Sequence, residues 1–488
     1  MNSYLEKIAK QLVSKEELRP HQEKGLQKLD ESGGVLLHHS TGSGKTKSFL
    51  TAIEREQARD KDARALVVAP ASLVSNIDKE IKKHGLKIDT KRLDAMSYEK
   101  AVNMSDELAK RKYAIAVADE AHKLRNADTK RSKDLGEIIS KADKRVLATA
   151  TANYNHLADL APLLNIVAGD KVLPTDWKEV ERRLTEKRIT KPGLIGKLLG
   201  KPNKEEVVLR ADKGLKKLME QHVSYYDSRE DPAAKSKFPT RTEETVEVPM
   251  DNKQLRYYKY VEGNIPFMLR MKIRHNLPLD KKEKANLNAF STGVRQASNS
   301  YRHLDKNKEG DFTPKVQEAS KRLLEKLKAD KNFKALVYSN FLESGLEEYS
   351  KKLKESGVRH SLFTGSLSKA EKDRLMKEYN AGTNKVMLIS SSGSEGLDTK
   401  GTKLVQILEP HFNKAKIDQV MGRADRFESH AHLPEAERKV HVEHYLSVHP
   451  KPFIGKAPYS IDKYLSENSD EKNKLFDQVK DLMKESDK

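Results

Sequence analysis

Short apolar runs rich in Val, Ile, Leu and Ala alternate with longer amphipathic segments in two separate blocks of the chain. Continuous apolar runs of this kind are typical of strands buried on both faces of a parallel sheet, and the amphipathic segments between them are typical of crossover helices. The pattern therefore predicts two α/β lobes, at residues 18–168 and 315–450. The expected strands are Val35–His38, Ala65–Ala69, Tyr113–Ala118 and Arg145–Ala148 in the first lobe, and Lys334–Ser339, Arg359–Phe363, Lys385–Ser390, Lys403–Leu408 and Lys439–Leu446 in the second.

The segment between the lobes, residues 169–314, has a different composition. Residues 187–217 are rich in Lys and Arg and contain helix-breaking glycines, and a second basic stretch covers residues 270–284. Thr245–Val248 has the pattern of one more strand. Two interpretations stay open, namely a solvated insertion or a subdomain that faces DNA or a protein partner.

The two ends of the chain predict helices outside the lobes. Residues 1–17 are expected to form an N-terminal helix, and residues 451–488 are expected to contain a C-terminal one. Because the apolar residues of the C-terminal helix fall on one face, its simplest role is a brace packed across the lobes. That face consists of Leu475, Phe476, Val479, Leu482 and Met483.

Composition narrows the class of protein. The 488 residues contain no cysteine, which excludes disulfides, thiol nucleophiles and thiolate zinc sites. No apolar run approaches membrane-spanning length and the N-terminus lacks a signal-type apolar core, so we expect a soluble, intracellular, cytoplasmic protein without a membrane partner. Lys and Arg number 93 against 73 Asp and Glu, and the net charge of +20 favours a polyanionic partner without separating DNA from RNA.

A glycine-rich loop follows the first predicted strand. It reads Ser40-Thr41-Gly42-Ser43-Gly44-Lys45-Thr46 and precedes a segment, Ser48–Glu56, that is predicted to be helical. Such a loop turns its N–H groups toward phosphates, the lysine reaches the β and γ oxygens, and the threonine hydroxyl coordinates Mg²⁺. His39 stands where the full pattern has its first glycine, but the inner part is intact. The sequence therefore predicts a nucleoside triphosphate site that uses ATP and Mg²⁺.

Two acidic residues follow another predicted strand of the same lobe. Asp119 and Glu120 come directly after the apolar run that ends at Ala118. The carboxyl edge of an open α/β sheet is where such a fold keeps its ligand site. We expect Asp119 to hold Mg²⁺ and Glu120 to act as the base that polarises the attacking water. Taken alone, such a pair could equally cap a helix.

The second lobe contains a pair of arginines three residues apart. Arg423 and Arg426 are expected on one face of a helix, 25 residues after a Ser-Glu-Gly-Leu-Asp segment at 394–398. Arginines presented to a transferring phosphoryl group stabilise its charge. An isolated Arg-x-x-Arg usually marks a solvated face, but Gln419 and Gly422 and the upstream segment favour the functional interpretation.

In order along the chain, these motifs resemble those of superfamily-2 helicases and translocases, in the Swi/Snf-type branch. The resemblance covers Leu18 to Arg426 and implies two tandem RecA-like P-loop lobes with parallel sheets. Its other matching segments are Leu18–Gln22, Ala69–Val74, Met96–Glu99, Thr149–Thr151, Val337–Phe341, Thr364–Ser366 and Ser390–Asp398.

The resemblance also implies roles for individual residues. Gln22 would contact the adenine base, and Glu395, Gly396 and Asp398 would join the phosphate loop in binding the nucleotide. The nucleic-acid contacts would come from Pro70, Ser72, Ser97, Tyr98, Ser339, Gly365, Ser391 and Ser392.

Within the superfamily, several stretches resemble the nucleoside-triphosphatase and early-transcription-factor ATPases of large DNA viruses. A viral protein would act in the host cytoplasm or the virion. Thr149-Ala150-Thr151 departs from the Thr-Gly-Thr usual in Swi/Snf remodellers, which argues against chromatin remodelling. The virus-like stretches are Val223–Tyr226, Phe238-Pro239, Val248–Met250, Ser429-His430, Leu433-Pro434 and Arg438–Val440.

These observations lead to one functional prediction. The chain is expected to be a monomeric, ATP-driven translocase that moves along duplex DNA through backbone contacts without separating the strands. A strand-separating helicase, an RNA-dependent ATPase of the same fold, and a regulatory protein with a silent nucleotide site stay open as alternatives.

Overall fold

The computed structural model describes residues 18–150, 157–190, 204–277, 279, 281–304, 311–391, 397–410 and 414–487. The chain forms two compact units, which we call lobe 1 (Met1–Glu230 and Lys474–Lys488) and lobe 2 (Asp231–Asn473). Among the helices of the described ranges, none has the length and apolar character needed to span a bilayer. The predicted N-terminal helix at residues 1–17 lies outside the described residues.

Lobe 1 is built on a six-stranded sheet with the order β3-β2-β4-β5-β1-β8, in which all paired strands are parallel. Apolar side chains cover both faces of this sheet, as the continuous apolar runs predict. The strands are β1 (Gly34–His39), β2 (Ala65–Ala69), β3 (Leu93–Ser97), β4 (Ile115–Asp119), β5 (Lys144–Thr149) and β8 (Val223–Tyr226).

The helices of lobe 1 cover the two faces of its sheet. Leu26, Phe49 and Ile77 pack on one face, and Leu135, Leu164 and Met219 pack on the other. A short antiparallel pair, β6 (Thr185–Thr190) and β7 (Lys204–Leu209), forms a separate sheet. The helices are α2 (Pro20–Ser32), α3 (Lys45–Arg59), α4 (Ala71–Val74), α5 (Ile77–Lys83), α6 (Tyr98–Asn103), α7 (Ser105–Leu108), α8 (Lys130–Ser140), α9 (Leu160–Ala168), α10 (Trp177–Leu184) and α12 (Lys213–His222).

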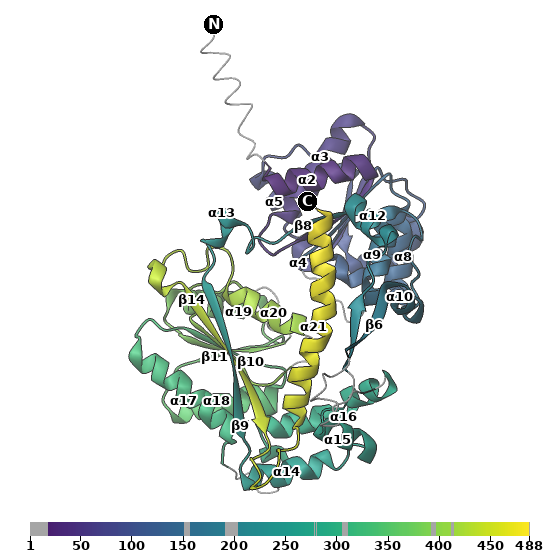
Figure 1. The fold of residues 1–488 in the computed structure, drawn as a ribbon. Helices are drawn as coiled ribbons and strands as arrows, with labels where there is room; N and C mark the ends of the chain where they lie inside the picture. Colours follow the sequence, from purple (N-terminus) through teal and green to yellow (C-terminus); the bar gives the residue numbers. More distant parts are fainter. Residues whose placement is uncertain are drawn as a thin grey trace. The chain divides into compact units, whose positions relative to one another are not determined.

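Lobe 2 contains a second six-stranded sheet with the order β11-β12-β10-β13-β14-β9, again parallel at every pairing. Figure 1 shows α17 and α18 on one side of this sheet and α19 and α20 on the other. The strands are β9 (Thr240–Pro249), β10 (Ala335–Ser339), β11 (Ser361–Phe363), β12 (Val386–Ser390), β13 (Leu404–Ile407) and β14 (Lys439–Val448). The helices are α13 (Pro232–Lys235), α14 (Asn252–Glu262), α15 (Phe267–Arg274), α16 (Lys281–Asn299), α17 (Pro314–Ala329), α18 (Glu348–Glu355), α19 (Lys369–Ala381), α20 (Lys414–Ala424) and the start of α21 (Ile461–Ser486).

The middle segment, expected as one insertion at residues 169–314, is divided between the lobes. β8 pairs with β1 at the edge of the lobe 1 sheet, and the ring Nδ1 of His222 lies 2.8 Å from the carbonyl oxygen of Gly34. β9 extends over ten residues, beyond the expected Thr245–Val248, because it pairs along the whole of β14. Each lobe therefore completes its sheet with a strand from this segment.

Helices α14, α15 and α16 form a small subdomain of lobe 2 with a core of its own. Tyr258, Leu269, Ile273 and Val294 meet there, together with Ile461 from the start of α21. A fully buried ion pair between Lys315 and Asp462 fixes the start of α21 in lobe 2, with 2.7 Å between Nζ and Oδ2.

The end of α21 packs in lobe 1. Val479, Leu482 and Met483 are buried in the core of that lobe, as the apolar face of the predicted C-terminal helix requires. The Asp487 carboxylate accepts a hydrogen bond from the backbone N–H of Tyr225 at 3.0 Å and forms an ion pair with Lys28 at 2.8 Å. The helix therefore has a specific anchor in each lobe.

Candidate nucleotide-binding site

The phosphate loop lies between β1 and α3, as predicted. All six residues of β1 are buried, and α3 begins at Lys45. Gly42 and Gly44 have φ values of 81° and 85°, which only glycine adopts at low cost. A Cβ at Gly44 would also stand 2.4 Å from the Gln22 side chain. The two glycines thus permit the turn that directs backbone N–H groups inward.

Lys45 is tucked back into this loop. Its Nζ donates hydrogen bonds to the carbonyl oxygens of His39 at 2.8 Å and Ser40 at 3.1 Å. Burial lowers the pKa of Lys45, while the charges of Asp119 and Glu120 oppose that shift. The ammonium and the two carboxylates therefore influence one another electrostatically at the carboxyl edge of the sheet.

His39, which replaces the first glycine of the motif, is accommodated without backbone strain. It is the last residue of β1, is fully buried, and shares a hydrogen bond of 3.0 Å with the Ser224 hydroxyl. Burial lowers its pKa well below the usual value, and electrostatic interactions with His21 and Lys45 add to the effect. The imidazole of His39 is therefore neutral near pH 7. It supports the start of the loop and adds no second positive charge beside Lys45.

Gln22 holds the end of the phosphate loop. Its Nε2 donates to the carbonyl oxygens of Gly44 at 2.9 Å and Ser43 at 3.3 Å, and its Oε1 accepts from the N–H of Arg19. In this state the amide contacts the protein backbone, and its contact with adenine stays a prediction.

The end of β8 and the residues that follow it support the loop from another side, a role that the sequence analysis did not predict. The His21 ring stacks on Tyr226 with 3.5 Å between ring centroids. The Ser40 hydroxyl accepts from the N–H of Ser228 at 2.9 Å. The virus-like match at Val223–Tyr226 was the one signal that could have identified this support.

The predicted carboxylates occupy the end of β4. Asp119 is its last residue, and Glu120 follows with a left-handed φ of 53°. Burial raises the pKa of Asp119 to about 6, and the neighbouring charge of Glu120 adds to the rise. Burial also acts to raise the pKa of Glu120, but His122, with its Nδ1 3.3 Å from the carboxylate, and Lys45 lower it overall.

This environment fits a divalent cation and phosphate. Two neighbouring carboxylates at a buried strand end lack full charge balance, and a divalent cation supplies it. Within the described part of the chain, the buried hydroxyl of Ser43 has no hydrogen-bond partner. Thr41, Ser43 and Thr46 lie on the loop or at the first turn of α3, where hydroxyl oxygens can meet phosphate or Mg²⁺.

Tyr98 is placed differently from the expectation of a nucleic-acid contact. Its side chain is fully buried, and its hydroxyl donates a hydrogen bond of 2.8 Å to the carbonyl oxygen of Asp119. Ser97 next to it caps α6 by accepting from the N–H of Lys100. Tyr98 therefore supports the strand end that carries the two carboxylates, a role that its position in the sequence did not reveal.

The other predicted nucleic-acid contacts differ in exposure. Ser339 is fully buried and donates to the Glu409 carboxylate at 3.0 Å, so its hydroxyl is engaged within lobe 2. Gly365 is exposed, while Pro70 at the start of α4 and Ser391 after β12 are half-buried. Ser392 lies outside the described residues, as does the Ser72 side chain.

The arginine pair of lobe 2 does not share a helical face. Arg423 lies in the last turn of α20, which ends at Ala424, and Arg426 follows the helix. The expectation of one face is wrong because α20 ends at Ala424, two residues before Arg426. Buried Asp425 lies directly after the helix and pairs with Arg241 of β9 at 3.2 Å. Arg426 Nη1 lies 3.4 Å from the Asp398 carboxylate.

Glu395 and Gly396 of lobe 2 lie outside the described residues, as does the side chain of Gln419, and so does Thr151 of lobe 1.

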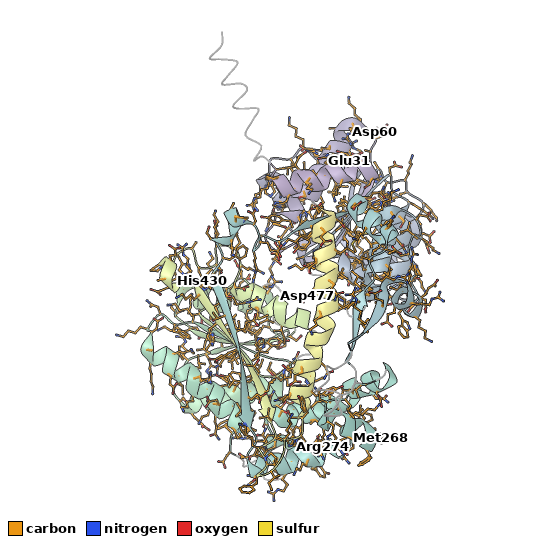
Figure 2. All side chains as sticks on the ribbon, viewed as in Figure 1. Glu31, Asp60, Met268, Arg274, His430 and Asp477 are labelled. Carbon is orange, nitrogen blue, oxygen red and sulfur yellow. The ribbon has the colours of Figure 1, made fainter. Side chains whose placement is uncertain are left out.

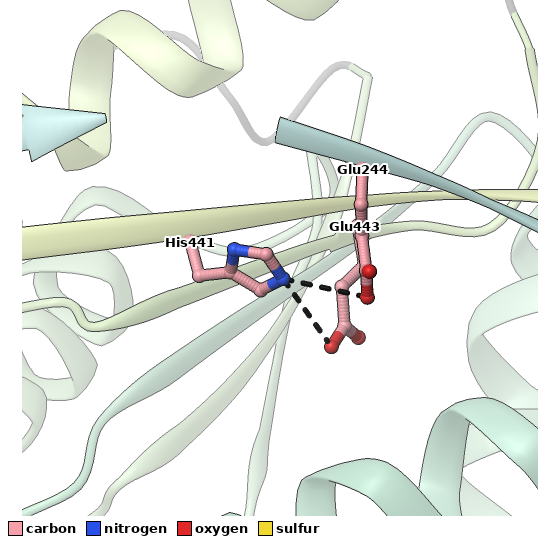
Figure 3. Close-up of side chains that lie close together, drawn as sticks. All are labelled: Glu244, His441 and Glu443. Atoms are coloured by element: carbon pink, nitrogen blue, oxygen red, sulfur yellow. Dashed lines mark ion pairs between the residues drawn. The ribbon is translucent and has the colours of Figure 1, made fainter. Parts of the chain in front are cut away.

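A second cluster of titratable groups lies on the lobe 2 sheet. Glu244 of β9 and His441 and Glu443 of β14 point toward one another (Figure 3). The His441 Nε2 lies 3.4 Å from Glu244 and 3.9 Å from Glu443. The Arg322 guanidinium pairs with Glu244 and lies 3.8 Å from Glu443. Since a cation of the protein already balances these acids, we interpret the cluster as an ion-pair network that ties β9 to β14.

Three segments of the chain match known protein families. The chain matches the DEAD/DEAH box helicase family at residues 19–108, the SNF2-related domain at residues 92–303 and the helicase conserved C-terminal domain at residues 317–428.

Individual relatives match along most of the chain. A protein of Acanthamoeba polyphaga mimivirus named putative ATP-dependent RNA helicase is 30% identical over 96% of this chain and 96% of its own length. A termination factor NPH-I homolog of African swine fever virus is 24% identical over 94% of this chain and 76% of its own length. The helicase domain of Pyrococcus furiosus Hef is similar in structure, with a TM-score of 0.48 and 16% identity over 88% of this chain and 95% of that one.

Proposed function

The chain belongs to the SNF2-related helicase family and is an ATPase of that family, and we propose that it uses ATP hydrolysis to move along DNA. The observation that carries the proposal is the meeting of Lys45, Asp119 and Glu120 at one edge of the lobe 1 sheet. Together these residues supply a phosphate-binding cation, a metal ligand and a base, which are the parts that phosphoryl transfer to water requires.

Each of these side chains has a separate task in the proposed reaction. Lys45 and the N–H groups of the loop bind the β and γ phosphates, and Thr46 and Asp119 hold Mg²⁺. When bound, Mg²⁺ neutralises charge that develops on the phosphate oxygens. Glu120 orients the attacking water and accepts its proton, and His122 keeps that carboxylate ionised by holding its pKa down.

Arg423 and Arg426 are proposed to act from lobe 2 on the transferring phosphoryl group. An arginine that contacts the γ-phosphate favours one arrangement of the lobes before hydrolysis and releases it afterwards. Asp398, 3.4 Å from Arg426, holds this guanidinium in the structure described here. Exchange of that partner for a phosphate oxygen would link nucleotide state to lobe movement.

The net charge of +20 supports a nucleic-acid partner, and contacts to its backbone would give little sequence preference and steep salt dependence. Relatives at lower identity include RAD54-like DNA repair and recombination proteins of Drosophila, which favours DNA. The mimivirus relative is named as an RNA helicase, so RNA is the second candidate substrate.

The deciding experiment measures ATP turnover with duplex DNA, single-stranded DNA and RNA of equal length at several salt concentrations. We expect duplex DNA to stimulate turnover most, with stimulation that falls as salt rises. If RNA stimulates ATP turnover more strongly than duplex DNA does, RNA and not DNA is the substrate. Displacement of a triplex strand from intact duplex, set against unwinding of a forked duplex, separates translocation from strand separation.

A silent nucleotide-binding protein is the remaining alternative. It predicts ATP binding without turnover on any nucleic acid, although Lys45, Glu120 and Arg423 are all present.

A further inference from the structure

The loop between β14 and α21, residues 449–460, carries two large apolar side chains in open solvent. Phe453 is 103% exposed and Ile454 is 85% exposed, which are the two highest values among the large apolar side chains of the described residues. Full exposure of adjacent large apolar residues costs solvation free energy unless a partner covers them. We call this pair of residues the apolar tip.

The base of this loop is fixed on the lobe 2 core. The Ser460 hydroxyl donates to the carbonyl oxygen of Ser447 at 2.6 Å, and the N–H of Tyr459 donates to the carbonyl of Arg274 at 3.0 Å. Three prolines at positions 450, 452 and 458 also restrict the loop backbone. The apolar tip is therefore presented from an anchored base.

The charged residues of this loop have a single sign. Lys451 and Lys456 flank the apolar tip, and residues 449–460 contain no Asp or Glu. Both lysines are exposed, and the ion pairs of the described part of the chain do not include either one. A partner that brings negative charge next to an apolar, stackable surface complements this arrangement.

The position of the loop indicates which partner that is. All strands of the lobe 2 sheet run parallel, so the loop leaves β14 at the same sheet edge as the residues that follow β10 and β12. The resemblance assigns half-buried Ser391, which follows β12 at that edge, to the nucleic-acid path. A strand that crosses this edge would reach the loop after β14.

We propose that the apolar tip binds the bases of a nucleic-acid strand, with Phe453 and Ile454 stacked on or inserted between bases and with Lys451 and Lys456 against the flanking phosphates. Apolar wedges of Phe and Ile unstack base steps, and aromatic rings bind single strands without sequence preference. The inference rests on the proposed nucleic-acid substrate and adds a base contact to a motor that otherwise contacts the backbone.

The test compares two fluorescent probes of equal length, an oligodeoxythymidine and an abasic deoxyribose-phosphate strand. Phe453→Ala with Ile454→Ala should weaken binding of the oligodeoxythymidine about tenfold, since base stacking supplies that order of affinity. Binding of the abasic strand should stay within about twofold of the parent, because its phosphates are unaffected. Equal affinity of parent and variant for both probes would overturn the proposal and favour a protein partner for the tip.

A matched control uses two other exposed apolar residues of lobe 2. Phe267 and Met268 of α15 are 63% and 65% exposed, and Met268 is labelled in Figure 2. Phe267→Ala with Met268→Ala should leave both affinities unchanged, and a tenfold loss there would also overturn the proposal. Lys451→Ala with Lys456→Ala should weaken the binding of both probes equally. The slope of log affinity against log salt concentration should fall by the amount expected for the loss of about two phosphate contacts.

ATP turnover of the parent chain is measured in parallel. Absence of stimulation by any nucleic acid would overturn the proposed function. Stimulation of the parent, combined with unchanged probe binding by the tip variant, would overturn this inference alone.

Discussion

The buried Tyr98 hydroxyl gives the sharpest test of how lobe 1 holds its carboxylates. Tyr98→Phe removes the hydroxyl that donates at 2.8 Å to the carbonyl oxygen of Asp119 and leaves the fully buried ring in place. No cavity larger than one oxygen atom results, so the change isolates the hydrogen bond. The affected carbonyl belongs to the residue proposed to hold Mg²⁺.

The magnitude follows from the burial of both partners. A net hydrogen bond contributes about 1 kcal/mol, and a buried acceptor left without a donor costs about 1–3 kcal/mol. We therefore expect Tyr98→Phe to destabilise lobe 1 by about 1–2 kcal/mol. In a unit of this size that loss lowers its melting temperature by roughly 2–8 °C, which differential scanning calorimetry resolves.

The effect on catalysis separates positioning from general stability. A shift of the Asp119 backbone displaces both carboxylates from the reacting phosphate, and about 1.4 kcal/mol of lost transition-state stabilisation lowers kcat tenfold. The KM for ATP should change little, because Lys45 and the phosphate loop have no hydrogen bond to Tyr98. We expect kcat to fall about tenfold at 25 °C with saturating nucleic acid.

Tyr349→Phe is the matched control. Tyr349 is also fully buried, and its hydroxyl donates to the Gln406 side chain at 2.6 Å in the core of lobe 2. The Tyr349→Phe variant should be destabilised by about as much as the Tyr98→Phe variant, and its kcat should equal that of the parent. The reasoning is refuted if Tyr98→Phe melts at the parent temperature with unchanged kcat, or if the control loses as much activity.

Three further substitutions test other parts of the structure. Lys45→Ala should abolish ATP turnover and keep salt-sensitive DNA binding, so DNA-stimulated hydrolysis in this variant would contradict the assigned site. Arg426→Ala should lower kcat much more than ATP affinity, and an equal fall in both would make Arg426 a binding residue. Lys315→Met leaves Asp462 as an uncompensated buried charge and should destabilise lobe 2 by about 3–5 kcal/mol in calorimetry. Adding Asp462→Asn should recover much of that loss, and a double variant as unstable as Lys315→Met would show that charge burial is not the cause.

Local sequence patterns were sufficient for the phosphate loop. The run Val35–Leu37, the glycines and Lys45 lie within a dozen residues, and each acts through its own backbone preference or its near neighbours. The strands β2 and β4 were predicted for the same reason. A strand that is buried on both faces is a continuous apolar run, which can be recognised in the sequence without knowing which strands it pairs with.

The strands β3 and β8 were not predicted, because they are determined by the strands they pair with and not by a local sequence pattern. β3 has mostly half-buried, mixed residues, and β8 is only four residues long. The pairing of His38 with Tyr225 joins positions far apart in the sequence, and no local pattern states which edge a short strand will join. The division of residues 169–314 between two lobes has the same origin.

The sequence alone determined which chemical groups are present. For the phosphate loop and for Asp119 and Glu120, it also determined that they lie at the carboxyl ends of strands. The tertiary structure decided what surrounds each of them. It placed the Tyr98 hydroxyl beneath Asp119, set His39 against Ser224, and ended α20 before Arg426. The physical reason is that burial, charge and hydrogen bonding depend on residues brought together by packing, whereas turn and strand preferences depend on neighbours along the chain.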